Sequence, residues 1–107
     1  MKTIYKFEHN NNIYIGSTTD LKVRCWAHNQ HKKQEKHKHL KLYKYCNDHG
    51  IEDVREYIEV LEEFDNKHLG KIGMRIIEHT YIKDFSANLN MISAISKKMQ
   101  KKKNIYN

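Results

Sequence analysis

Five side chains of this sequence belong to types that take part in chemistry at phosphate groups: Tyr5, Tyr14, Arg24, His28 and Glu78. A single glutamate can hold a divalent ion that keeps most of its water ligands, as Mg²⁺ prefers. An arginine offers two donors to phosphate oxygens where negative charge accumulates. A phenol has an unperturbed pKa near ~10, so a tyrosine acts as a base only beside a cation that favours the phenolate.

Each of these residues also has an ordinary structural interpretation. Tyrosines in strands are most often half-buried packing residues, and an arginine followed by a histidine on a helix usually faces solvent. Glu78 stands beside an apolar pair, where a carboxylate at the boundary of the core is common. The histidines between residues 28 and 39 could bind a transition metal adventitiously, but a closed zinc site needs four ligands and the sequence offers no second half. Only the joint arrangement of the five side chains favours a functional site.

The two tyrosines fall on segments with strand character. Residues 3–8 and 12–16 are rich in β-branched and aromatic side chains, and a cluster of asparagines separates them. This pattern predicts a β-hairpin. The hairpin would place Tyr5 and Tyr14 on adjacent antiparallel strands.

Helices are expected to carry the other candidate residues. The hydroxyl and carboxylate side chains that end at Asp20 are a strong N-cap signal, so a first helix should run from about Asp20 into the thirties. A second helix is expected from about Lys38, closed by Gly50 in the C′ position. Arg24 and His28 would lie one turn apart on the first helix.

The rest of the chain completes an α+β pattern. Residues 54–64 alternate enough to be a third strand with an acidic exposed face, and Asn66 can cap a last long helix that carries Glu78. A stripe at helical spacing is expected to face the core there: Leu69, Ile72, Gly73, Ile76, Ile77 and Thr80. Residues 84–92 should leave that helix as a loop. The predicted fold is a small three-stranded antiparallel β-sheet flanked by helices.

The charge is unevenly distributed along the 107 residues, whose net charge is +7. Residues 22–44 hold eight Lys and Arg with a single acid, whereas residues 48–65 hold eight acids with a single Arg. Five lysines follow in residues 97–103. Two basic blocks around an acidic one indicate a protein with one face suited to a polyanion, although a lysine-rich surface without a partner would look the same.

Composition excludes several classes of protein. No apolar run is long enough for a membrane-spanning helix, and the first ten residues lack the apolar stretch of a signal peptide. We therefore expect a protein that is intracellular, located in the cytoplasm and not secreted. In such a compartment Cys25 and Cys46 should be reduced thiols.

The ordered set of motifs resembles the GIY-YIG nuclease family. Thr3-Ile4-Tyr5 corresponds to the first motif, with Thr in place of the Gly that names it, and Tyr14-Ile15-Gly16 is an intact second motif. The family's helix arginine and the histidine four residues later match Arg24 and His28. Its glutamate matches Glu78, and a polar residue after the last helix matches Asn90 best, with Asn88 a close second. The resemblance covers roughly residues 3–92.

The resemblance implies a metal-dependent DNA endonuclease, with a catalytic domain over residues 1–93 and a basic C-terminal tail over residues 94–107. It implies Mg²⁺ or Mn²⁺ bound at Glu78 and a phosphate-binding role for Arg24. The first-motif tyrosine, Tyr5, would be the general base, with Tyr14 and His28 orienting water or phosphate. The residues alone do not separate these roles. A non-catalytic nucleic-acid-binding module or recruiter with the same fold is the alternative interpretation.

The first basic block would then line the approach to the site. Contacts of lysines with backbone phosphates give affinity without reading sequence. The expected substrate is double-stranded or branched DNA, and selection of the target by a protein partner is left open. The lysines expected to bind nucleic acid are Lys32, Lys33, Lys36, Lys38, Lys41 and Lys44.

Overall fold

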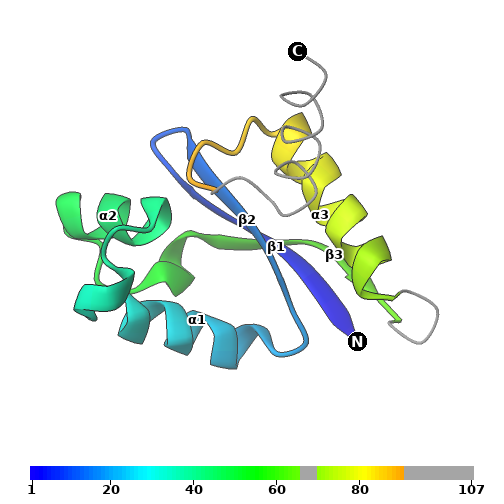
Figure 1. Ribbon diagram of the computed structural model, residues 1–107, viewed down its shortest axis with the longest axis horizontal. Helices are drawn as coiled ribbons and strands as arrows, with labels where there is room; N and C mark the ends of the chain where they lie inside the picture. The colour runs from blue at the N-terminus through cyan, green and yellow to red at the C-terminus, as the bar shows by residue number, and fades with distance from the viewer. Residues whose placement is uncertain (66–69, 91–107) are drawn as a thin grey trace, which may run out of the picture.

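A computed structural model describes residues 1–65 and 70–90 of the chain. Three strands and three helices follow one another as β-β-α-α-β-α, and two short 3₁₀ turns precede α2 and β3 (Figure 1). None of the helices in these residues combines the length and apolar character needed to cross a bilayer. The elements are β1 (Lys2–His9), β2 (Asn12–Thr18), α1 (Leu21–His31), α2 (Lys41–Asp48), β3 (Ile58–Phe64) and α3 (Lys71–Asp84).

The three strands form one antiparallel sheet in the order β2-β1-β3, so β1 is central and β2 is an edge strand. The turn between β1 and β2 has Asn10 and Asn11 at φ values of 49° and 65°, a left-handed conformation that asparagine tolerates. The register pairs Tyr5 with Gly16 and Phe7 with Tyr14. The predicted hairpin and fold class are confirmed.

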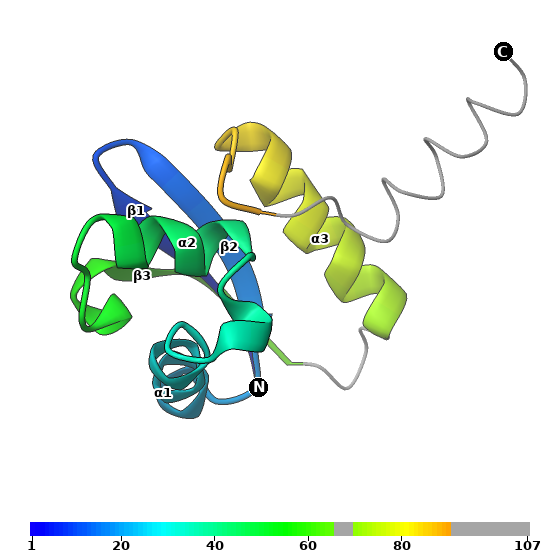
Figure 2. The same ribbon diagram turned by 60° about the vertical axis from the view of Figure 1, so that its left-hand side comes forward.

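The two faces of the sheet are covered by different helices (Figure 2). Phe7 of β1 packs with α1 and α2 in one cluster of buried residues. Ile4 and Ile15 pack with Met74 of α3 in a second cluster on the opposite face. Side chains alternate between the faces of a strand, which explains how neighbouring residues of one short strand enter separate clusters.

Two predicted boundaries need correction. Residues Val54–Tyr57 form a 3₁₀ turn, and the third strand begins only at Ile58, because the Asp53 side chain accepts a hydrogen bond from Arg55 N and caps the turn. The second helix begins at Lys41 rather than near Lys38, since residues 35–37 form a separate 3₁₀ turn. Gly50 follows α2 with φ of 67°, as expected for a residue that ends a helix.

The last helix presents a different face to the sheet than the one predicted. It begins at Lys71 with Gly70 as its N-cap, whereas the predicted cap, Asn66, lies outside the described residues, as do Leu69, the end of the predicted loop at residues 91–92 and the predicted basic tail at residues 94–107. Ile72 is 70% exposed and Ile76 is 54% exposed. Of the predicted stripe, Ile77 does pack against the sheet, together with four residues that the stripe did not include: Met74, Tyr81, Ile82 and Phe85. The large rings at 81 and 85, which the predicted stripe omitted, bury more apolar area than two isoleucines and set the rotation of the helix.

Candidate active site

The hairpin brings the two tyrosines to the same face of the sheet. Their ring centroids are 6.2 Å apart. Tyr5 is fully buried, and its ring lies directly over Gly16 on the neighbouring strand. A Cβ atom at position 16 would approach the Cζ and hydroxyl oxygen of Tyr5 to 2.4 Å. The glycine of the second motif therefore makes room for the tyrosine of the first.

A chain of hydrogen bonds connects Tyr5 to α1 and α2 through His28. The hydroxyl of Tyr5 lies 2.7 Å from His28 Nε2, and the hydroxyl of Tyr43 lies 2.8 Å from Nδ1. The Arg24 guanidinium can only donate, so the Tyr5 oxygen accepts a hydrogen bond from it. A neutral imidazole has one N–H group, so His28 donates to one of the two tyrosine hydroxyls and accepts from the other.

Burial keeps His28 neutral. Its side chain is 2% exposed, and burial, assisted by the charges of Arg24 and His31, lowers its pKa to about 3. Both ring nitrogens already form hydrogen bonds with tyrosine hydroxyls. A second proton on the imidazole would therefore take up the lone pair that accepts one of these bonds. His28 is thus a fixed link between tyrosines in the free protein and is not charged at neutral pH.

This pKa shift predicts acid sensitivity of the fold. Since the pKa of His28 is lower in the folded state than the ~6.5 of an unfolded chain, its contribution to stability is complete above ~6.5. That contribution should fall by about 1.4 kcal/mol per pH unit as the pH drops below that value toward the folded pKa. Urea unfolding of the wild type and of His28→Gln at pH 7.5 and 5.0 measures it. The variant, which cannot titrate there, should lose about 2 kcal/mol less than the wild type. Equal losses would contradict the prediction.

Arg24 lies between the two tyrosines and Glu78. It occupies the first turn of α1, a helix that starts where Asp20 accepts a hydrogen bond from Val23 N at 3.1 Å. The guanidinium interacts with the hydroxyls of both Tyr5 and Tyr14, and its charge also acts on Glu78. Its Nε is buried and finds no hydrogen-bond partner within the described part of the chain. An unpaired buried donor costs about 1–3 kcal/mol, a cost typical of sites that a ligand completes.

Both phenols are protonated at neutral pH in the free protein. Burial raises the pKa of Tyr5 and of Tyr14, and Arg24 lowers both pKa values without reversing the effect. Tyr14 differs from Tyr5 in position, because it lines an open cavity of about 200 Å³ together with Arg24, Lys41, Tyr43 and Asn90. Of the two tyrosines, Tyr14 is the one that borders space for a substrate.

Glu78 approaches the site from the opposite face of the sheet. It lies on α3, and its Oε2 accepts a hydrogen bond of 3.0 Å from the hydroxyl of Ser17, 61 residues away in the sequence. Burial raises the pKa of Glu78, while Ser17 and then Arg24 act to lower it. The negative charge of Glu78 also acts to raise the pKa of Tyr14. The candidate site therefore straddles β2, with the tyrosines on one side and the carboxylate on the other.

The loop after α3 is attached to the free edge of β2 by two asparagines. Asn90 Oδ1 accepts from Ile15 N and its Nδ2 donates to Ile15 O, both at 2.8 Å. Asn88 Oδ1 accepts from Ile13 N at 2.9 Å in the same manner. Asn90 lines the cavity with Tyr14, but its amide group positions the loop and the strand. Its predicted catalytic role stays a prediction.

The donor set around Glu78 fits a hydrated divalent ion and no other kind of metal site. The described residues contain no group of three or more His, Cys, Asp or Glu side chains that could enclose a metal. One carboxylate with a neighbouring hydroxyl suits Mg²⁺ or Mn²⁺, which retain several water ligands. A closed zinc site is not formed by the histidines from 28 to 39.

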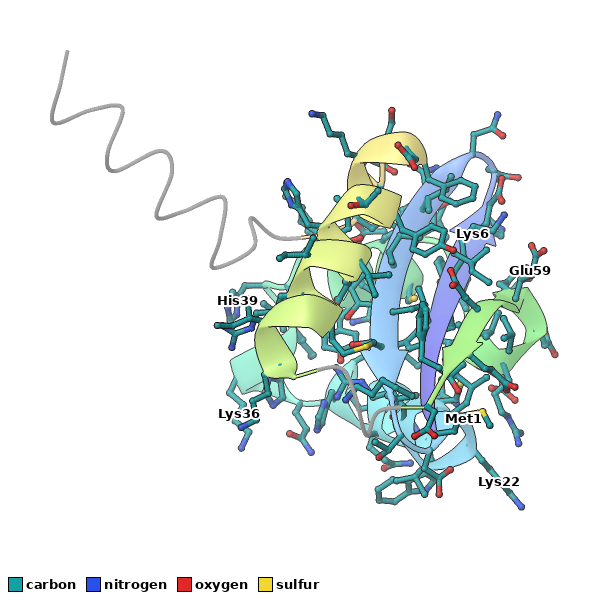
Figure 3. All side chains as sticks on the ribbon, turned by 90° about the vertical axis from the view of Figure 1, so that its right-hand side faces the viewer. Met1, Lys6, Lys22, Lys36, His39 and Glu59 are labelled. Atoms are coloured by element: carbon teal, nitrogen blue, oxygen red, sulfur yellow. The ribbon has the colours of Figure 1, made fainter. Side chains whose placement is uncertain are left out.

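One of the six lysines predicted to bind nucleic acid, Lys32, is buried inside the fold. Lys32 is 3% exposed, and its Nζ donates to the backbone carbonyls of Ile51 and Glu52, so burial of its charge is offset by hydrogen bonds inside the fold. Lys38 forms an exposed ion pair of 2.7 Å with Glu35. Lys41 lines the cavity beside Tyr14. The remaining lysines are exposed, and Figure 3 shows Lys36 extending away from the body of the molecule.

Two residues of the arrangement were not predicted as parts of a site. The hydroxyl of Ser17 orients Glu78, and in the sequence only its position directly after the second motif points to it. Tyr43 completes the hydrogen-bond chain through His28, and nothing in the sequence distinguishes it from Tyr45, the other tyrosine of α2. The five residues on which the sequence prediction rests, Tyr5, Tyr14, Arg24, His28 and Glu78, do lie together.

Comparison with known families agrees with this arrangement. The family model of the GIY-YIG catalytic domain matches residues 1–90, which contain every residue of the candidate site. Neither the curated proteins nor the solved structures contain a match to the chain. The matched range extends from the start of β1 to Asn90, the last residue that the structure describes.

Proposed function

The chain belongs to the GIY-YIG family, and we propose that this phosphodiester-hydrolysing nuclease is an endonuclease that cleaves DNA with one divalent ion held by Glu78. The observation that carries the proposal is the convergence of Tyr14, Arg24 and Glu78 on one edge strand, from three separate elements. A phenol, a guanidinium and a carboxylate are the groups needed for a base, a phosphate ligand and a metal ligand.

Arg24 is the residue that would bind the scissile phosphate. Its guanidinium borders the cavity and carries a buried Nε without a partner in the described residues. Donors fixed before the substrate arrives stabilise negative charge as it develops on phosphate oxygens. The hydroxyl of Tyr5 accepts a hydrogen bond from this guanidinium, and the same hydroxyl is hydrogen-bonded to His28.

Tyr14 is the tyrosine best placed to receive a proton from the attacking water, because it lines the cavity while Tyr5 is fully buried. This assignment departs from the family resemblance, which favours Tyr5. The burial that raises the pKa of Tyr14 means that further positive charge is needed before the phenol can act as a base. A divalent ion at Glu78, when bound, would supply that charge, polarise the phosphate and provide the nucleophilic water.

DNA is the proposed substrate because exposed lysines, one of them in the wall of the cavity, can neutralise backbone phosphates without selecting a sequence. Lys41 lies in the cavity wall, and Lys33, Lys36 and Lys44 are exposed. A binding module or recruiter that cuts nothing would need the same surface. It would not need the phenol and the carboxylate on either side of β2.

Cleavage of supercoiled plasmid and of branched DNA in Mg²⁺ tests the proposal. The wild type should nick at least one of these substrates. Tyr14→Phe should lower kcat by at least about 100-fold, the usual contribution of a general base, with DNA affinity unchanged. Tyr5→Phe should chiefly lower the free energy of unfolding, because it removes a fully buried hydroxyl from the chain through His28.

Three outcomes would contradict parts of the proposed function. Absence of nicking by the wild type on every substrate would reject the endonuclease. Equal cutting by the wild type and both variants would indicate a contaminating nuclease. Near-normal cutting by Tyr14→Phe together with an inactive but folded Tyr5→Phe would transfer the role of base to Tyr5.

A further inference from the structure

A second cleft opens beside Glu78, on the side of β2 that faces α3. Its volume is about 530 Å³, larger than the cavity beside Tyr14. It lies where the start of β1 approaches the first turns of α3, so segments from opposite ends of the fold form its walls (Figure 1). The lining residues are Lys2, Ser17, Gly70, Lys71, Met74, Arg75 and Glu78.

The charges that line this cleft are mostly positive. Lys2, Lys71 and Arg75 contribute three cations, and Glu78 is the one carboxylate among the lining residues that the structure describes. None of the three cations forms an ion pair with a carboxylate in the described residues, where the pairs involve Lys6, Lys38 and Arg55 instead. Lys71 and Arg75 are exposed.

This arrangement favours the binding of an anion. A cleft lined mainly by one sign of charge concentrates ligands of the opposite sign, and the excess here remains positive with Glu78 ionised. The sequence had pointed to the lysines of residues 32–44 as the basic face, on the α1 and α2 side of the sheet. Lys2, Lys71 and Arg75 come from none of those segments and lie on the other side of Glu78.

We propose that this cleft binds a backbone phosphate of the substrate strand next to the one held by Arg24. This inference rests on the proposed function, since it places the same nucleic acid across the edge of β2. One part of the strand would meet Arg24 and Lys41 in the first cavity, and the neighbouring part would meet Lys71 and Arg75 in the second. The scissile phosphate would then lie over β2, between Tyr14 and Glu78.

The salt dependence of DNA binding tests the second cleft. Binding of duplex DNA is measured in EDTA, so that no cleavage occurs, with the full chain and its variant Lys71→Gln/Arg75→Gln. The slope of log K against log salt falls by about 0.9 for each phosphate that is no longer neutralised, so the double variant, which loses the one phosphate of this cleft, should lose about 0.9. Its KM for cleavage in Mg²⁺ should rise correspondingly.

Lys83→Gln is the matched control, because Lys83 is an exposed cation on the same helix that lines neither cavity. It should leave the slope and KM as in the wild type. An unchanged slope in the double variant, or an equal change in the control, would overturn the second phosphate site while cleavage by the wild type would leave the proposed function standing. A wild type that neither binds nor cuts DNA would overturn both.

Discussion

Glu78→Gln is expected to abolish cleavage, lowering kcat by at least about 10³-fold, while the protein remains folded and binds DNA. The amide keeps the shape of the side chain and can still accept the hydrogen bond from Ser17, but it is a far weaker ligand for a divalent ion. Because burial already raises the pKa of Glu78, removing the charge should not lower the free energy of unfolding. Cleavage rate against Mg²⁺ concentration, with a gel-shift assay in EDTA, measures both parts.

Asp84→Asn serves as the control for this variant, since it removes a carboxylate from the exposed last position of the same helix. It should cut DNA at the rate of the wild type. Retention of normal cleavage by Glu78→Gln at low Mg²⁺ would show that the carboxylate holds no essential ion. Loss of DNA binding by the variant would show instead that its effect is on the fold.

Gly16→Ala should strongly lower the free energy of unfolding. The new Cβ would lie 2.4 Å from Tyr5, whose ring is fully buried and cannot turn aside. Overpacking of this kind typically costs about 1–3 kcal/mol, and displacement of Tyr5 would add the loss of its hydrogen bond to His28. Urea unfolding and the cleavage rate should both show large losses.

Gly70→Ala is the matched comparison. No atom of the part of the chain that the structure describes lies within 4 Å of a Cβ at Gly70, and its φ of −71° suits alanine. We expect a loss of no more than about 1 kcal/mol, from the poorer N-cap. Equal stability of Gly16→Ala and Gly70→Ala would mean that the sheet yields easily at Tyr5, contrary to its burial.

The local parts of the fold could be predicted from sequence because their signals are local. The asparagines of the hairpin turn, the Asp20 cap and the positive φ of Gly50 each depend on a few neighbouring residues. The order of the motifs likewise identified Tyr14 and Glu78 before any contact between their elements was visible.

The errors concern choices that only tertiary packing makes. The helix α3 has two overlapping apolar faces. The face with Tyr81 packs on the sheet, and Ile76 on the other face is exposed. Lys32 lies within a run of basic residues like its neighbours, but two carbonyls from the segment after α2 capture its ammonium group. The bond between Ser17 and Glu78 joins residues that no periodic pattern relates.

The asparagine attachment of the last loop also bears on self-association. An edge strand with free N–H and C=O groups invites a strand from another chain and leads to aggregation. On β2 those groups are occupied by Asn88 and Asn90, and on β3 exposed glutamates such as Glu59 and Glu62 oppose pairing by charge repulsion. The loop after α3 and the acidic side chains of β3 thus make both edges of the sheet unsuited to pairing with a second polypeptide.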